Sequence, residues 1–423
     1  MTPEPFDSLR RVGHPCIRDV QAFSGRVMSA GVLILGAGQA AAQLAVSLRQ
    51  GGYAGAIRMV GDEPYAPYQR PPLSKAYLKE KASIDTLLLR GPNYWADHQV
   101  ALELGTAANA VDLARKQVTL ADGRSVSYDT LVFATGTRAR DLPLPGIGLD
   151  GVFSLRKIDD VRRLRPALDA VRRIAIVGAG YIGLEVAAVL RQEDRAATVI
   201  EAEARVMKRV AGEEVSRFFD GLHRSRGVDI RLGARLAGIE GEGRATGVAL
   251  VSGEKIAADL VLVATGARAN DDLAAAAGLP CDDGILVDDF ASAAPGVYAI
   301  GDCARFFSHR YGRRIRLECV QNAIDQAKAA ASAILGKPVP YDPVPWFWSD
   351  QYEIKLQITG LLDGYDACET AGNPAESRFS VEYRKAGKLV AVDAINDGRA
   401  HMLGRRRIAA DLPEVGTVPR PTA

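Results

Sequence analysis

The stretch Val32-Leu-Ile-Leu-Gly36-Ala-Gly38-Gln39-Ala40-Ala41 decides the fold of this 423-residue chain. An apolar run of β-forming residues leads into a Gly-x-Gly-x-x-Ala turn, and a helix-forming sequence follows. Gly36 permits the tight turn, Gly38 lets the backbone approach a diphosphate, and Ala41 lets the helix pack closely on the strand. The diphosphate would lie at the helix N-terminus, where backbone N–H groups are unpaired. This pattern predicts a strand–turn–helix unit that binds a dinucleotide.

The same pattern recurs at Ile174-Ala-Ile-Val-Gly178-Ala-Gly180-Tyr181-Ile182-Gly183-Leu-Glu185. Each copy is followed by a second β-like run that ends in an acid, and later by a strand that ends in Ala-Thr-Gly, at residues 134–136 and 264–266. Such a domain-scale repeat indicates a duplicated architecture rather than a short-period repeat. A chain that holds two dinucleotides side by side is expected to pass electrons between them.

The acid after each unit predicts how the nucleotide ribose is bound. Glu201 lies 23 positions after Gly178, the usual place for a carboxylate that accepts hydrogen bonds from a ribose 2′-hydroxyl and repels a 2′-phosphate. We therefore expect NADH rather than NADPH in the second unit, although the nearby Arg205 favours a phosphate. In the first unit Asp62 and Glu63 both qualify, and we prefer Asp62 because it lies at the strand end.

Composition limits the class of protein. With 48% hydrophobic residues, 25% charged residues and a net charge of +2, the chain is typical of a soluble protein of several domains, and nothing favours nucleic acid as a partner. Residues 27–48 are uncharged and long enough to cross a bilayer, but their glycines fall in the dinucleotide register, which favours a strand, a turn and a helix. We expect a cytoplasmic protein without membrane contact, and a flexible extension at residues 1–30.

The five cysteines, at positions 16, 281, 303, 319 and 368, are widely spaced and include no Cys-x-x-Cys or Cys-x4-Cys pair. The protein is therefore expected to carry reduced structural thiols, no redox disulfide and no metal of its own. A disulfide reductase or NADH oxidase shares both glycine-rich units but needs a redox cysteine soon after the first, and none lies between Cys16 and Cys281.

Four longer motifs accompany the glycine-rich turns, and within them Arg70-Pro-Pro-Leu-Ser-Lys75 and Trp348-Ser-Asp-Gln351 are far more specific than the turns. They are Asp62-Glu-Pro-Tyr-Ala-Pro-Tyr-Gln-Arg70-Pro-Pro-Leu-Ser-Lys75, Gly301-Asp302-Cys303-Ala304, Glu318-Cys-Val-Gln-Asn-Ala323 and Trp346-Phe-Trp-Ser-Asp-Gln351. Together with both turns, over about residues 30–410, they resemble the FAD- and NADH-dependent ferredoxin reductases that serve bacterial cytochrome P450 and ring-hydroxylating dioxygenase systems.

The resemblance implies an α/β fold with two Rossmann-like domains of the glutathione-reductase type and a C-terminal mixed α/β domain. Residues 31–140 and 267–340 would form a discontinuous FAD-binding domain, residues 141–266 the NADH-binding domain, and residues 341–423 the C-terminal domain. In that last domain, alternating residues at 355–359 and 379–383 predict strands of an antiparallel sheet.

The resemblance also implies the site. Lys75 would lie near the reactive flavin nitrogen and pair with Glu185, and Trp348 would pack beside the flavin, whereas Trp346 and Phe347 are expected in the core. A buried lysine needs such a partner, and a cation beside the flavin favours its reduced form. The remaining candidate FAD-binding residues are Gly36, Gly38, Gln39, Ala40, Asp62, Arg70, Thr135, Gly136, Arg138, Asp302, Val320 and Gln321. The candidate NADH-binding residues are Gly178, Gly180, Tyr181, Ile182, Glu185, Glu201 and Gly266.

On this resemblance, electrons pass from NADH through FAD to an acidic [2Fe–2S] ferredoxin, which supplies a cytochrome P450 or a dioxygenase. An acidic partner needs a basic docking face. The candidates for that face are Arg310, Arg313, Arg314, Arg316, Arg405, Arg406 and Arg407. The protein is expected to be a monomer or a weak dimer. A rubredoxin reductase, and a flavoprotein resembling apoptosis-inducing factor, are the other assignments left open.

Overall fold

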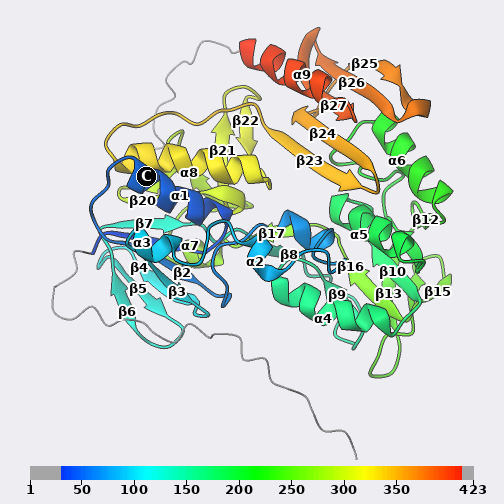
Figure 1. Ribbon diagram of the computed structural model, residues 1–423, viewed down its shortest axis with the longest axis horizontal. Helices are drawn as coiled ribbons and strands as arrows, with labels where there is room; N and C mark the ends of the chain where they lie inside the picture. Colours follow the sequence, from blue (N-terminus) through cyan, green and yellow to red (C-terminus); the bar gives the residue numbers. More distant parts are fainter. Residues whose placement is uncertain (1–29, 412–423) are drawn as a thin grey trace, which may run out of the picture.

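The structure, a computed structural model that describes residues 30–411, is built on two parallel sheets and a third, antiparallel sheet (Figure 1). The extension expected at residues 1–30 lies outside the described residues, apart from Ala30. Within residues 30–411, no helix combines the length and the apolar character that crossing a bilayer requires.

The first sheet has six strands in the order β19-β20-β7-β1-β2-β3. They are β1 (Val32–Leu35), β2 (Ile57–Gly61), β3 (Val100–Leu104), β7 (Thr130–Phe133), β19 (Ser292–Ala294) and β20 (Val297–Ala299). All pair in parallel except the edge strand β19, which runs antiparallel to β20. Strands from before residue 140 and after residue 266 share this sheet, so the chain leaves it and later returns.

Helices α1 (Gln39–Gln50) and α8 (Val320–Ile334) lie side by side on one face of this sheet (Figure 1). Their contact is rich in alanine, since Ala41, Ala327 and Ala330 are buried in one cluster with the sheet. Small side chains let two helices approach closely. The strand, turn and helix expected in the first unit, and the helix expected after residue 320, are confirmed.

Two small sheets cover the opposite face, where Leu33 and Leu35 point. One contains β4 (Ala108–Asp112), β5 (Gln117–Leu120) and β6 (Ser125–Ser127), and the other contains β18 (Ile285–Val287), β21 (Ala304–Ser308) and β22 (Arg313–Ile315). The short helices of this part of the chain are η1 (Pro71–Ser74), α2 (Ile84–Leu87), α3 (Tyr94–Asp97), α7 (Asp272–Ala276) and η2 (Gly301–Cys303).

The second sheet, β12-β11-β10-β16-β9, has five parallel strands. They are β9 (Val152–Ser154), β10 (Arg173–Val177), β11 (Ala196–Ile200), β12 (Asp229–Arg231) and β16 (Leu260–Val263). One face is covered by helices α4 (Ile158–Asp169), α5 (Tyr181–Gln192) and α6 (Glu213–Ser225). The other is covered by the antiparallel strands β13 (Leu236–Glu240), β14 (Gly247–Leu250) and β15 (Lys255–Ala257).

The repeated Ala-Thr-Gly lies directly against each glycine-rich turn. Gly36 has φ +113°, and a Cβ added there would lie 2.1 Å from the carbonyl oxygen of Ala134. Gly178 has φ +105°, and its added Cβ would lie 2.5 Å from the carbonyl oxygen of Ala264. Glycine is therefore required at both positions for two reasons: the backbone is left-handed there, and the neighbouring strand approaches closely.

Two short strands carry the chain between the parallel sheets. Strand β8 (Thr137–Ala139) leaves the first sheet and β17 (Ala267–Ala269) returns to it, and the two pair antiparallel. Both crossings therefore run together, directly after the two Ala-Thr-Gly segments.

The third sheet, β23-β24-β27-β26-β25, is antiparallel throughout. Its strands are β23 (Trp346–Gln351), β24 (Ile354–Gly360), β25 (Ala367–Asn373), β26 (Arg378–Lys385) and β27 (Lys388–Ile395), with η3 (Pro374–Glu376) between β25 and β26. Helix α9 (Gly398–Ala410) packs on β24 and β27. The expected antiparallel sheet is confirmed.

One core expectation is wrong. Trp346 and Phe347 are both partly exposed, because β23 is an edge strand of its sheet and not a central one. Phe347 still packs against the largest buried cluster, whereas Trp346 lies beside Trp348 with ring centroids 5.7 Å apart.

Candidate functional site

Each glycine-rich turn forms an open cradle at a helix N-terminus. Gly38 and Gly180 are the N-cap residues of α1 and α5, and neither helix start has a side-chain cap. A Cβ added at either glycine would meet no atom within 4 Å. The unpaired first-turn N–H groups therefore face open space, which fits a diphosphate. Gln39 and Ala40 begin α1, and Tyr181 and Ile182 begin α5, so these four predicted residues lie at the two cradles.

The acid of the second unit is held by backbone amides. The Glu201 carboxylate accepts hydrogen bonds from the N–H of Ala179 (2.7 Å), inside the glycine-rich turn, and from the N–H of Glu203 (2.9 Å). Arg205 donates instead to the carbonyl of Ala211 (2.7 Å) and to Oγ of Ser216 (2.5 Å). Arg205, the candidate ligand for a 2′-phosphate, is therefore already hydrogen-bonded to Ala211 and Ser216.

The two acids of the first unit lie in different surroundings. Asp62 is 57% exposed and pairs with Nζ of Lys157 at 2.6 Å. Glu63 is buried and accepts from the hydroxyl of Tyr68 (2.6 Å) and from Arg70 (2.7 Å). The preference for Asp62 as the ribose ligand stays a prediction. Glu63 orients Arg70, a contact that the sequence did not suggest.

Lys75 and Glu185 form an ion pair, with Nζ 2.7 Å from Oε2. Lys75 follows η1 in the proline-rich loop, whereas Glu185 lies in the first turns of α5, so the pair joins the two units. The side chain of Glu185 is 4% exposed and that of Lys75 22%. Ser74 donates to Oε2 at 2.5 Å and Ser349 to Oε1 at 2.7 Å. The expected pairing is confirmed, and the structure adds the two serines.

Asp302, the expected ligand of the flavin ribityl chain, is already paired. Its Oδ2 lies 2.7 Å from Nη2 of Arg156 and 3.3 Å from Oγ1 of Thr137. Arg156 follows β9, at the start of the second unit. Arg156 could not be predicted from the sequence, because it belongs to no motif and lies far from Asp302 along the chain.

Thr135, Gly136 and Arg138 lie where the chain crosses between the sheets. Oγ1 of Thr135 donates to the carbonyl of Asn270 (2.6 Å), whose amide donates back to Thr135 (2.8 Å). Arg138 pairs with Asp272 at 2.8 Å. Gly136 has φ +64° and open space around an added Cβ. Contacts of these residues with FAD stay predictions.

Gly266 lies between β16 and β17, beside Arg209. A Cβ added at Gly266 would lie 3.2 Å from Nη2 of this exposed arginine, which the sequence analysis missed. Thr265, just before it, carries a buried hydroxyl without a hydrogen-bond partner among the described residues.

Helix α8 begins at the expected residues and contacts the third sheet. Its N-cap is Cys319, whose sulfur accepts from the N–H of Asn322 at 3.4 Å, and Val320 is its first residue. Oε1 of Gln321 accepts from the backbone N–H of Trp346 at 3.4 Å. Burial raises the pKa of Cys319 to about 12, so it is a protonated thiol at neutral pH and not a redox thiolate.

The four described cysteines are free, as expected, and Cys16 lies outside the described residues. Burial raises the pKa of Cys281 to about 11 and also raises the pKa of Cys303. The Cys303 sulfur lies 3.3 Å from the carbonyl oxygen of Ile300, inside the core of the first unit. Cys281 and Cys303 are therefore protonated thiols at neutral pH.

Three aromatic residues of β23 reach the second unit and the last helix. Trp348 is partly exposed, and Phe347 stacks on Tyr181 with ring centroids 4.5 Å apart. The guanidinium of Arg405, from α9, lies 5.7 Å from the Trp346 ring centroid, a cation–π contact. Strand β23 thus contacts the first residue of α5 through Phe347 and the basic helix α9 through Trp346, and the rings of Trp346 and Trp348 have centroids 5.7 Å apart.

The predicted basic face is smaller than expected, because most of its arginines are paired within the chain. Arg313 pairs with Asp363, and Arg407 with Glu382. The other contacts are those of Arg316 with Asp283 (3.2 Å) and Glu318 (2.7 Å), and of Arg310 with the carbonyl of Ile408 (2.5 Å). Arg405 and Arg406 are exposed on α9, and neither forms an ion pair within residues 30–411.

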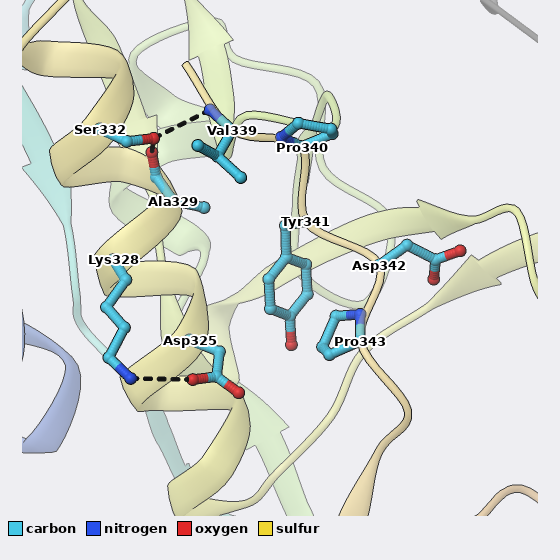
Figure 2. Close-up of a pocket in the computed structure, with 9 residues that line it drawn as sticks. All are labelled: Asp325, Lys328, Ala329, Ser332, Val339, Pro340, Tyr341, Asp342 and Pro343. Carbon is cyan, nitrogen blue, oxygen red and sulfur yellow. Dashed lines mark hydrogen bonds and ion pairs between the residues drawn. The ribbon is translucent and has the colours of Figure 1, made fainter. Parts of the chain in front are cut away.

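A separate hollow lies between α8 and the segment that leads to the third sheet (Figure 2). The hydroxyl of Tyr341 donates to Asn322 (2.5 Å), and Oγ of Ser332 accepts from the N–H of Val339 (3.0 Å). These two hydrogen bonds hold the segment on the helix, and Lys328 pairs with Asp325 within α8. None of the predicted site residues lines it.

Two glycine-rich cradles, an ion pair between a buried glutamate and a partly exposed lysine, and an aromatic strand beside that pair define an oxidoreductase that binds two dinucleotides. A profile described as pyridine nucleotide-disulphide oxidoreductase matches residues 30–331, and one described as reductase C-terminal matches residues 346–415. The chain therefore belongs to the pyridine nucleotide-disulphide oxidoreductase family, whose members use FAD and NAD(P)H.

Several relatives are named as ferredoxin reductases, and two others, at 38% and 36% identity, as rubredoxin–NAD+ reductases. A ferredoxin–NAD(P)+ reductase of Sphingomonas sp. is 44% identical over 90% of this chain and 92% of its own length. The solved structure of a ferredoxin reductase from Rhodopseudomonas palustris is 42% identical, with a TM-score of 0.87 over 89% of this chain and 94% of that one. The covalent putidaredoxin reductase–putidaredoxin complex is 40% identical, also with a TM-score of 0.87, over 90% and 94%. The resemblance inferred from the motifs, and the fold class, are confirmed.

Proposed function

We propose that the protein passes electrons from NADH through bound FAD to a small [2Fe–2S] ferredoxin, which supplies a cytochrome P450 or a ring-hydroxylating dioxygenase. The observation that carries this proposal is the Lys75–Glu185 pair, because it joins the two units where two bound nucleotides would meet. When bound, FAD supplies the chemistry of accepting a hydride and releasing single electrons. Hydride transfer needs alignment rather than an acid–base pair, so the chain's task is positioning.

The residues at the two cradles bind and orient the nucleotides. The N–H groups at the starts of α1 and α5 hold the two diphosphates, aided by the helix dipoles. Lys75 places a positive charge beside the flavin, and Glu185 keeps that charge in position. Trp348 covers the flavin at the point where electrons leave. On the same proposal Asp62, Arg70, Thr135, Gly136, Arg138, Asp302, Val320 and Gln321 contact FAD.

The same arrangement favours NADH over NADPH. The Glu201 carboxylate is fixed at the second turn by two backbone amides and would repel a 2′-phosphate. Arg205 is held by its own loop and is a poor phosphate ligand in this position. The Sphingomonas relative is named as a ferredoxin–NAD(P)+ reductase, so its name does not distinguish NADH from NADPH.

The docking face consists of Arg405, Arg406 and the partly exposed Trp346 and Trp348. Arg405 lies over the Trp346 ring and Arg406 is its exposed neighbour on α9. This face suits an acidic partner, because the charges speed encounter and the rings supply apolar area. We place the reaction in the cytoplasm, where free thiols stay reduced. We expect a monomer or a weak dimer.

The test uses the full chain loaded with FAD. In stopped flow, NADH should bleach the flavin absorbance within milliseconds to seconds, and a [2Fe–2S] ferredoxin should restore it faster than a dye or a rubredoxin does. A higher turnover with rubredoxin than with ferredoxin would mean that rubredoxin is the partner. Slow bleaching by NADH and a long-lived reduced protein would contradict the proposal and favour the apoptosis-inducing-factor type.

A further inference from the structure

A line of buried hydrogen bonds runs from Glu185 away from the nucleotide cradles. Oγ of Ser349 lies 2.7 Å from Oε1 of Glu185, and Nε2 of Gln351 lies 3.2 Å from Oγ of Ser349. Oε1 of Gln351 lies 2.8 Å from Nε2 of His223, and the Tyr352 hydroxyl lies 3.3 Å from Nδ1 of that ring. Glu185, Ser349, Gln351 and His223 are all buried.

Each bond in this line donates toward Glu185. The Gln351 amide donates to Ser349, so the Ser349 hydroxyl proton is left for the Glu185 carboxylate. The Gln351 carbonyl then accepts, which requires a proton on Nε2 of His223 and leaves Nδ1 to accept from Tyr352. With the amide reversed, Ser349 would have to donate to Gln351, and Oε1 of Glu185 would lose its donor.

The protonation states at the outer end fit this direction. Burial lowers the pKa of His223 to about 4, so the ring is neutral at pH 7 and one nitrogen can accept. Burial raises the pKa of Tyr352 to about 12, so its hydroxyl keeps the proton that it donates. The charged groups around this end are Arg226, over the Tyr352 ring, Arg191 and Glu353, which also act on Tyr352, and Asp220, on the same helix α6 as His223.

We propose that Ser349, Gln351 and His223 are positioning residues that fix the Glu185 carboxylate against Lys75 through this one-way chain of hydrogen bonds. The proposal rests on the proposed function, in which Lys75 lies beside the flavin. Glu185 is on α5 and His223 on α6, both in the second unit, whereas Ser349 and Gln351 are on β23 of the third sheet. The third sheet would thus take part in hydride transfer as well as in docking.

The first measurement concerns His223 alone. Nitrogen NMR of the oxidised, FAD-loaded full chain with labelled histidine should show a neutral ring with its proton on Nε2 from pH 5 to pH 8. Assignment comes from His223→Asn, or from His98→Asn and its counterparts if the first variant fails to fold. A proton on Nδ1, or titration of His223 between pH 6 and pH 7, would overturn the chain of bonds. Neither NADH nor ferredoxin is present, so this result is independent of the proposed function.

The second measurement concerns Glu185 and the flavin. In Ser349→Ala, the limiting rate of flavin reduction by NADH should fall about tenfold while the NADH half-saturation stays within twofold, and the flavin midpoint potential should shift. Ser349→Thr keeps the hydroxyl and should restore both. The matched control is Ser380→Ala, a buried serine of the same sheet that is outside the chain of bonds. If Ser349→Ala kept the wild-type rate and potential, the proposal would fail.

The third variant changes Gln351, the next residue in the chain of hydrogen bonds, and replaces a hydrogen-bond donor with an acceptor. Gln351→Glu has nearly the same shape but offers an acceptor where the amide N–H was, so Ser349 must divide its single proton between two carboxylates. The pKa of His223 should rise, and the flavin reduction rate should fall as in Ser349→Ala. A raised pKa of His223 together with an unchanged flavin rate would show that the chain does not reach Glu185, and would overturn the positioning role. If Ser349→Ala folds poorly, Tyr352→Phe at the partly exposed end gives the same test with a smaller expected effect.

Discussion

The ammonium group of Lys75 lies 2.7 Å from the carboxylate of Glu185, although the two residues belong to different nucleotide-binding units. A pair buried between two units can hold its geometry only while both units keep their relative positions. Breaking such a pair from one side leaves an uncompensated charge, which is costly in a buried site. The pair therefore depends on how the two units pack against each other, and on the proposed function it sets the charge beside the flavin.

Glu185→Gln should slow flavin reduction by NADH about tenfold or more, since Lys75 loses the group that orients it. It should also lower the unfolding free energy by roughly 2 kcal/mol, less than for a fully buried pair, because Lys75 is partly exposed. Stopped-flow bleaching of the flavin measures the first effect and chemical denaturation the second. Lys328→Ala, which removes a surface lysine of α8, is the control. Equal rates in Glu185→Gln and the wild type would rule out the assigned role.

The wild-type protein should use NADH with a higher kcat/KM than NADPH. Glu201→Ala removes the charge that repels a 2′-phosphate, so the ratio of the two kcat/KM values should narrow about tenfold, or about 1.4 kcal/mol. Part of this change would come from weaker NADH binding, because the carboxylate also accepts from the N–H of Ala179. Steady-state rates with both nucleotides and an artificial acceptor decide the point. A wild-type preference for NADPH would show that the role of Glu201 is wrong.

The double variant Arg405→Glu, Arg406→Glu should raise the KM for an acidic ferredoxin about tenfold at low salt, because encounter with such a partner depends on complementary charge. Flavin reduction by NADH should stay unchanged, since both residues lie on α9. The dependence of the ferredoxin rate on ionic strength should weaken in the variant. Arg217→Ala, which removes a surface arginine of α6, is the matched control. If the rate at which the wild-type protein reduces ferredoxin did not depend on ionic strength, this docking face would be excluded.

The parts of the fold that could be predicted are those that local sequence determines. Gly36 and Gly178 stand where a left-handed turn meets a neighbouring strand, and that requirement is visible as a fixed spacing of glycines. The repeated Ala-Thr-Gly was visible as a repeat, but its cause was not, because the contact between Ala134 and Gly36 exists only in three dimensions.

The parts that could not be predicted depend on contacts between distant residues. Arg316 is surrounded in the sequence by other arginines, so it suggested a basic surface, yet it folds against Asp283 and Glu318. His223 belongs to none of the sequence motifs, yet it is buried and the third sheet covers it. Asp283 and Gln351 are distant in the sequence from the residues that they contact, so no local pattern around Arg316 or His223 indicates these contacts.

A carboxylic acid that this mechanism does not use lies inside the third sheet. Asp393, on β27, is fully buried, and its Oδ2 accepts from the hydroxyl of Tyr383 at 2.8 Å, while Oδ1 has no partner among the described residues. Burial raises the pKa of Asp393 to about 7. An aspartate in the unfolded chain has a pKa of about 3.9, so between pH 4 and pH 7 the native protein holds a proton that the unfolded chain releases.

Asp393 should therefore lower the free energy of unfolding as the pH rises from 4 to 7. The total loss should be on the order of 4 kcal/mol, and it should be complete above pH 7, once the carboxyl of the folded protein has ionised. Asp393→Asn keeps an acceptor for Tyr383 but cannot ionise. Its thermal midpoint should exceed that of the wild type at pH 8 and match it at pH 4.5. Other groups titrate in the same range, so the difference between the two proteins at each pH isolates Asp393. A constant difference across this range would show that Asp393 is ionised throughout in the folded protein.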